Sequence, residues 1–215
     1  MSFFIQLLET TDAERVELEG LQKIQDMLGG KMTREEYIAF LLDLYHVVWH
    51  FVPIMGAAAS RCPDAFRQVR YHLYHEIEEE KGHELMVLED LKVFGIEAEA
   101  VTTRVPSYPV QAMLAYNYYT CERVHPCAVV GMLYALEFIS SVYSGQLAAA
   151  ISLGLKMPLP QGFTFLDSHS AMDLNHLAEL RELLQTIDDP AAQEIIMNAI
   201  QVNFYLFKQF MLFLT

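Results

Sequence analysis

The chain has 215 residues, 53% of them apolar, which is enough to bury a core as one domain over residues 1–215. Its 14 Lys and Arg residues oppose 28 Asp and Glu, and the net charge of -14 argues against nucleic acid and anionic membranes as partners. The three cysteines form neither a CxxC pair nor a disulfide framework, and the acidic N-terminus does not resemble a signal peptide. We therefore expect a cytoplasmic protein.

Helical patterns follow one another along the whole chain. A capping box of Thr33 and Glu36 precedes a helix that should kink or restart at Pro53. Gly95 ends the next long helix, and prolines or glycines bound the later ones. The expected helices cover residues of about 12–28, 33–53, 63–94, 110–123, 126–154, 164–186 and 190–215.

These seven helices, with no competing strand pattern or internal repeat, predict an all-α bundle with short connections. Residues 124–155 are apolar enough to resemble a membrane span, and Glu137 is their only acid or base of fixed charge. Several serines and Gln146 in this segment, beside otherwise amphipathic helices, instead favour the central helix of a soluble bundle.

Glu137 is then a buried acid, which is costly unless it is paired, protonated or bound to a cation. Pairing with a neighbouring Arg or Lys and binding to a cation both remain open on this residue alone.

Three metal-binding side chains recur in the segment 164–186, at His169, Asp173 and His176. Because a helix turns about 100° per residue, steps of four and three residues bring all three to one face. One face of one helix thus offers most of a metal half-site.

A third cluster lies in the second long helix. Glu80 and His83 have the Glu-x-x-His spacing by which di-iron bundle proteins direct a carboxylate and an imidazole inward. Glu76 lies one turn before Glu80, so either glutamate is a candidate ligand. Glu78 and Glu79 are expected to be solvated.

A glutamate and a histidine on one helix, an isolated glutamate later, and then His-x3-Asp-x2-His together resemble the ligand pattern of the haem-oxygenase-like di-iron oxidases and oxygenases. That superfamily shares a seven-helix fold with thiaminase II (TenA), pyrroloquinoline-quinone synthase (PqqC) and a chlamydial death-domain-associated protein. The resemblance implies two Fe(II) per chain that activate O2 to oxidise a small organic acid, amine or amino acid. The implied ligands are Glu80 or Glu76, His83, Glu137 as a bridge, His169, Asp173 and His176.

The same resemblance suggests where a substrate would bind. We expect the pocket to be lined by Trp49, His50, Phe51, Tyr134 and Phe138. His46 and His50 are spaced to reach the site, although a polar core position or a substrate contact suits them better than ligation. A homodimer could use the aromatic C-terminal helix.

Other classes of function remain open. A TenA-like thiaminase would use a cysteine nucleophile, for which Cys121 is the candidate. A PqqC-like oxidase would need no metal, and a haem protein would need basic residues for the propionates. A non-catalytic interaction protein would use the C-terminal phenylalanines Phe204, Phe207, Phe210 and Phe213.

Overall fold

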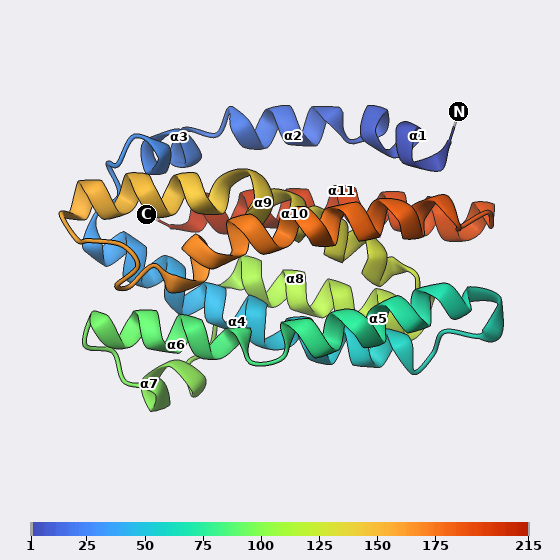
Figure 1. Ribbon diagram of the computed structural model, residues 1–215, viewed down its shortest axis with the longest axis horizontal. Helices are drawn as coiled ribbons and strands as arrows, with labels where there is room; N and C mark the ends of the chain where they lie inside the picture. Colours follow the sequence, from blue (N-terminus) through green and yellow to red (C-terminus); the bar gives the residue numbers. More distant parts are fainter. Residues whose placement is uncertain (1, 215) are drawn as a thin grey trace.

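The computed structural model describes residues 2–214, with the exception of the side chains of residues 170–174 in one helix. The described chain is a bundle of helices, as the periodicity predicts (Figure 1). The helices are α1 (Phe3–Thr10), α2 (Asp12–Glu19), α3 (Gln22–Leu28), α4 (Arg34–Ala59), α5 (Arg67–Glu80), α6 (His83–Val93), α7 (Ala98–Thr102), α8 (Tyr108–Tyr119), α9 (Ala128–Leu155), α10 (Thr164–Gln185) and α11 (Pro190–Phe213). A 3-10 turn precedes α5, and a π-helical turn, Thr120–Val124, follows α8.

The long helix α9 occupies the centre of the bundle and packs against α10 and α11. On the opposite side, α4 packs against α5, α6 and α8, and the short helices α1 to α3 run along one long edge (Figure 1). Because α10 also contacts α5 and α6, the segments that carry the predicted ligands meet at one place.

The helix count differs from the seven expected, for local reasons. The expected helix at 12–28 is two short helices, α2 and α3, and α1 precedes it. Helix α7 adds a single turn after α6. The expected helix at 63–94 is broken between α5 and α6, where Gly82 has a φ of 92°. In contrast, α4 does not restart at Pro53 but runs through it to Ala59.

Two of these helices, α4 and α9, are long and apolar enough to cross a membrane by length and composition. Within the bundle, 56% and 39% of their respective apolar windows are buried. Core helices of soluble proteins have the same properties, so the expectation that the chain does not enter a membrane remains a prediction.

The start of α10 is fixed by a side chain from another helix. Asp90 of α6 is buried, and its two carboxylate oxygens accept hydrogen bonds from the backbone N–H groups of Thr164 (2.8 Å) and Phe165 (3.0 Å). These N–H groups have no acceptor within their own helix, and a carboxylate at this end also interacts favourably with the helix dipole. Asp90 therefore sets the position of α10 along α6.

Close contact between α9 and α11 depends on Gly131. A Cβ atom at this position would lie 2.5 Å from the Ile196 carbonyl oxygen and 2.7 Å from the Ala199 Cβ. Gly56, which lies inside α4, offers a contrast because a Cβ atom there would meet no atom within 4 Å.

We predict that Gly131→Ala lowers the free energy of unfolding by about 2 kcal/mol, because the two backbones must separate to admit the methyl group. Gly56→Ala should raise it by up to about 1 kcal/mol, since alanine is the better helix former. Urea denaturation followed by circular dichroism measures both. Equal stability of the two variants would contradict the close packing of α9 on α11.

Candidate metal centre

The break between α5 and α6 brings a carboxylate and an imidazole together. Glu80 is the last residue of α5 and His83 is the first of α6, and between them Gly82 adopts a left-handed conformation that favours glycine. His83 Nδ1 lies 2.8 Å from Glu80 Oε2. The two predicted ligands therefore lie in contact, although they belong to different helices.

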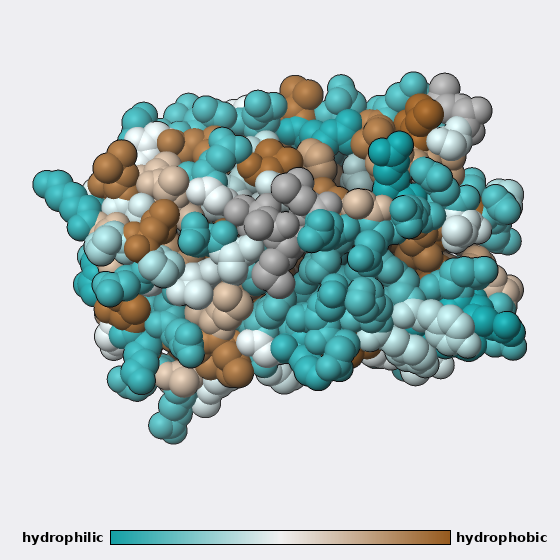
Figure 2. Space-filling view, in the orientation of Figure 1, coloured by the Kyte–Doolittle hydropathy of each residue, from teal (hydrophilic) through white to brown (hydrophobic). Residues whose placement is uncertain are grey.

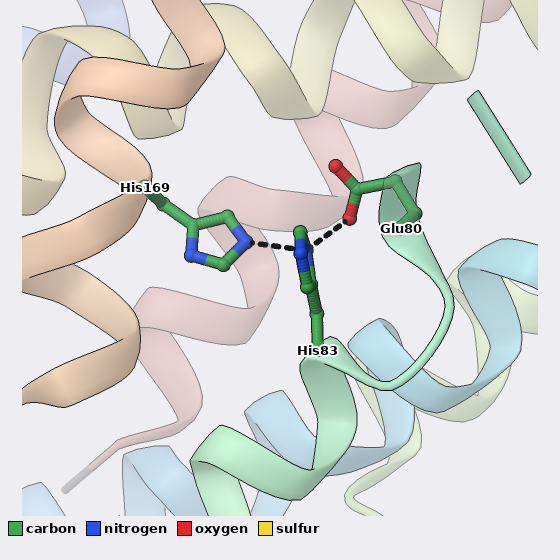
Figure 3. Close-up of side chains that lie close together, drawn as sticks. All are labelled: Glu80, His83 and His169. Atoms are coloured by element: carbon green, nitrogen blue, oxygen red, sulfur yellow. Dashed lines mark hydrogen bonds and ion pairs between the residues drawn. The ribbon is translucent and has the colours of Figure 1, made fainter. Parts of the chain in front are cut away.

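A second imidazole approaches from α10. His169 Nδ1 donates a hydrogen bond to the Phe165 carbonyl oxygen (2.9 Å), and its ring stacks on the Phe165 ring. Because a carbonyl can only accept, Nδ1 carries the proton and Nε2 presents its lone pair. Nε2 faces His83 Nδ1 at 3.0 Å, and Figure 3 shows the two imidazoles and Glu80 converging on one point.

A second group of ligand atoms lies one turn away, formed by Glu76, Glu80 and His176. All three side chains are buried, and His176 Nδ1 lies 3.5 Å from Glu80 Oε1 and 3.9 Å from Glu76 Oε2. In each of the two groups the ligand atoms lie within 4.8 Å of one another, a spacing that suits metal bonds of about 2.0–2.6 Å. Glu80 belongs to both groups.

The other two predicted ligands are placed differently. Glu137, on α9, is 4% exposed and lines the same cavity as Glu80 and His169. It is absent from the groups that the described side chains form. Asp173 lies on α10 between His169 and His176, and its side chain lies outside the described residues.

Burial and hydrogen bonding put His169 and Glu80 in the protonation states that a cation requires. Burial lowers the pKa of His169 to about 4, so its imidazole is neutral at pH 7. Burial alone would raise the pKa of Glu80, but the hydrogen bond from His83 and the nearby imidazoles outweigh it and hold the pKa below its usual value. Neutral imidazoles and an ionised carboxylate are the forms that bind metal.

An apolar cavity of about 100 Å³ opens onto these groups between α4, α9 and α11. Its lining residues lie on one face of α4 from Phe40 to Phe51, and on one face of α9 from Leu136 to Leu147. At 1.5 Å per residue, both stretches are about 16 Å long. The cavity is therefore elongated, with Glu80, Glu137 and His169 in its wall.

Only Phe51 of the five predicted pocket residues lines this cavity. Helix geometry explains the difference, because the lining face of α4 carries Leu44, Val47, Val48 and Phe51, whereas Trp49 points outward and is 45% exposed. His50 contacts Tyr118 through a hydrogen bond (2.9 Å), and Tyr134 and Phe138 stack on each other outside the lining.

Several residues near the site had no role in the sequence interpretation. Glu79 is exposed, as expected, but it also lies 3.2 Å from His176 Nε2. Glu78 is exposed and bonded to Lys81. Ser140 and Ser144 line the cavity, and their hydroxyl groups lie 2.9 Å apart. Ser140 and Ser144 follow Glu137 by three and seven residues, so helical spacing places all three on one face of α9. This spacing is the sequence signal that could have identified the two serines.

Cys121, the candidate nucleophile, is fully buried within the π-helical turn and does not line the cavity. Burial raises the pKa of its thiol to about 12. The thiolate is the nucleophilic form, so this environment suppresses rather than activates the residue.

The chain belongs to the family of iron-containing redox enzymes, whose model matches residues 38–204. This match covers α4 to most of α11 and includes every predicted ligand.

Two solved structures share the fold. A domain of unknown function with a heme oxygenase-like fold from Shewanella denitrificans has a TM-score of 0.85 at 22% identity, covering 100% of this chain and 92% of that chain. A TenA homologue from Pseudomonas syringae has a TM-score of 0.83 at 14% identity, covering 97% and 90%. The fold class is thereby confirmed as the haem-oxygenase-like, TenA-like bundle.

One relative with a named activity also matches. A 4-aminobenzoate synthase from Chlamydia pneumoniae is 23% identical over 196 residues, which cover 87% of this chain and 84% of the relative.

We predict that the native protein does not react with Ellman's reagent at pH 8. At a pKa of about 12 only on the order of one thiol in 10,000 is ionised at Cys121, and all three cysteines are buried. Three thiols should titrate in guanidinium chloride. Rapid modification of Cys121 in the folded protein would revive the thiaminase-like alternative.

Proposed function

We propose that the protein is an O2-dependent oxidase or oxygenase that holds two Fe(II) ions per chain and oxidises a small organic substrate. The observation that supports this proposal most strongly is the pair of ligand groups that share Glu80 beside an apolar cavity. Membership of the iron-containing redox enzyme family supports iron as the metal. Neutral imidazoles with carboxylates suit iron, whereas structural zinc sites favour closed sets of thiolates.

Each side chain has a role that follows from its position. His83 and His169 would hold one ion with Glu80, and His176 and Glu76 would hold the other with the second oxygen of Glu80. Glu80 is thus the best-placed bridge in the described part of the chain. Glu137 and Asp173 are the further carboxylates of the predicted set, and Glu137 already faces the cavity.

The protein contributes orientation and exclusion of water. The hydrogen bond from His169 Nδ1 to Phe165 fixes the tautomer that presents Nε2 to a metal. Apolar walls keep water away, and thereby strengthen electrostatic interactions between the buried groups. When bound, iron ions would supply the electrons for redox chemistry with a small molecule.

The cavity also indicates the class of substrate. Among the described residues that line it, there is no lysine or arginine to neutralise a carboxylate, and the polar groups apart from Glu80, Glu137 and His169 are the hydroxyls of Ser140, Tyr143 and Ser144. An organic acid would therefore direct its carboxylate toward the metals and its body along α4 and α9. We propose an elongated, mostly apolar acid in preference to an amino acid with a second charge.

We predict that anaerobic protein binds two Fe(II) per chain tightly. His83→Ala and His176→Ala should each bind one, and Glu80→Gln should bind less than one because both groups lose a ligand. His50→Ala is the control and should bind two, since this imidazole contacts Tyr118 and lies outside the cavity lining. Equilibrium dialysis with a colorimetric iron assay gives the counts.

Oxygen consumption by the iron-loaded protein completes this test. We expect uptake of O2 by the wild type and its loss in Glu80→Gln, without any absorption band typical of haem. Iron binding that is unchanged in His83→Ala, His176→Ala and Glu80→Gln would refute the two-iron centre.

The substrate class can be tested with linear monocarboxylates on iron-loaded protein. Decanoate should raise the melting temperature more than hexanoate, because binding to the folded state stabilises it and the longer chain fills more of the cavity. Val47→Phe narrows the cavity and should diminish the shift with decanoate while leaving iron binding intact. Val142→Phe, at an exposed position of α9, is the matched control. Equal shifts with both acids in all three proteins would contradict an elongated apolar site.

A further inference from the structure

The row of potential ligands extends beyond the two groups described above, toward the surface. On α5, His72, Glu76 and Glu80 follow one another at intervals of four residues and so share one face. On α10, Glu179 follows His176 by three residues and extends the same face. Where α5 packs on α10, the two helices therefore present ligand side chains for one turn more than a two-metal centre requires.

The outermost members of this row form a third group, His72, Glu76 and Glu179, whose ligand atoms lie within 4.8 Å of one another. His72 Nε2 lies 3.3 Å from Glu76 Oε1. Glu76 is fully buried and belongs to both this group and the one with His176. The three groups thus form a continuous series in which Glu80 links the first to the second and Glu76 links the second to the third.

The state of His72 points to a ligand at this place. Its side chain is nine-tenths buried, and its Nε2 atom makes no hydrogen bond within the part of the chain that the structure describes. The atom nevertheless faces the Glu76 carboxylate. A buried imidazole nitrogen without a hydrogen bond is uncommon because it forfeits its interaction with water. A cation between His72 Nε2 and the carboxylates would satisfy it.

Exposure rises steadily along the series. Glu76 is 0% exposed and His72 is 10% exposed, whereas Glu179 is 43% exposed and the neighbouring His75 is 52% exposed. His75 Nε2 lies 3.6 Å from carboxylate oxygens of both Glu79 and Glu179, and the only ion-pair partners of these two acids among the described residues are histidines. Figure 2 shows hydrophilic side chains gathered over α5 on this face. The outer group is therefore open to solvent and negatively charged, while the inner groups are closed.

We propose that His72, Glu76 and Glu179 form a third divalent-cation site, from which metal enters the two-metal centre. The entry role rests on the proposed function, because the two-metal centre is where the metal would be delivered. A hydrated cation first exchanges water for Glu179 and His72 at the rim. Because Glu76 has one oxygen toward His72 and the other toward His176, the cation then moves inward by exchanging ligands about one carboxylate. The step involves no change of oxidation state.

The site can be counted with Mn(II) alone, since free Mn(II) gives an electron paramagnetic resonance signal that broadens on binding. The wild type should bind three Mn(II) per chain, the third more weakly because two of its ligands contact solvent. Glu179→Gln and His72→Gln should each bind two. Glu182→Gln is the matched control and should bind three, since it removes the same charge from an exposed position one turn further along α10.

These counts separate failure of the outer site from failure of the centre. An unchanged count in both Glu179→Gln and His72→Gln overturns the third site. Loss of one ion in Glu179→Gln, with no loss in His83→Ala or Glu80→Gln, retains the outer site and refutes the proposed centre. Melting temperatures check that each variant is folded. Glu179→Gln should fold normally, because the Glu179 side chain is 43% exposed.

Entry through this site is tested by the rate at which apoprotein takes up Fe(II), measured as iron that a rapid chelator no longer removes. Glu179→Gln should fill the centre several-fold more slowly than the wild type and Glu182→Gln, yet reach the same final occupancy of the inner positions. Equal rates in Glu179→Gln and wild type would overturn the entry role.

Discussion

The burial of carboxylates beside imidazoles, inside a bundle whose interior is otherwise apolar, is the constraint on which the other features depend. Glu76, Glu80 and Glu137 are each no more than 6% exposed, and removing a carboxylate from water is costly unless positive charge or hydrogen bonds compensate. The compensation visible at Glu80 is imidazole, from His83 on one side and His176 on the other. Imidazoles that remain neutral compensate weakly, whereas divalent cations between the same atoms would compensate strongly, so the folded chain favours metal binding.

Two local features place these groups against each other. Gly82 ends α5 and lets α6 start at His83, so that the imidazole turns back toward Glu80. Seven residues later, Asp90 binds the first N–H groups of α10, which fixes where His169 lies relative to His83. Both features act through the backbone at helix ends, where hydrogen-bonding groups are not satisfied within the helix. The positions of the side chains are therefore set by rigid elements rather than by the ligands themselves.

Much of the fold could be predicted from the sequence, because helical periodicity and its punctuation by proline and glycine are local properties. The break at Gly82 could not, since a glycine within a helical pattern is often tolerated and only its φ shows that the helix ends there. The candidate ligands were identified from spacing within single helices. Spacing alone left Glu76 and Glu80 as alternatives, whereas the packing of α5 on α10 places both beside His176. The residues predicted for a substrate pocket mostly lie outside the cavity lining, because the face of α4 that lines a cavity is decided by its partners α9 and α11.

The apolar cavity and the groups of candidate metal ligands together constrain which molecules can bind and in which order. The apolar walls from Phe40 to Phe51 and from Leu136 to Leu147 can bind an organic molecule only if its charged end is neutralised elsewhere, since the described lining has no lysine or arginine. In the proposed centre, metal ions held by Glu80 and His169 would supply positive charge at that wall. Metal binding should therefore precede binding of an acidic substrate, and the affinity for such a substrate should depend on metal occupancy.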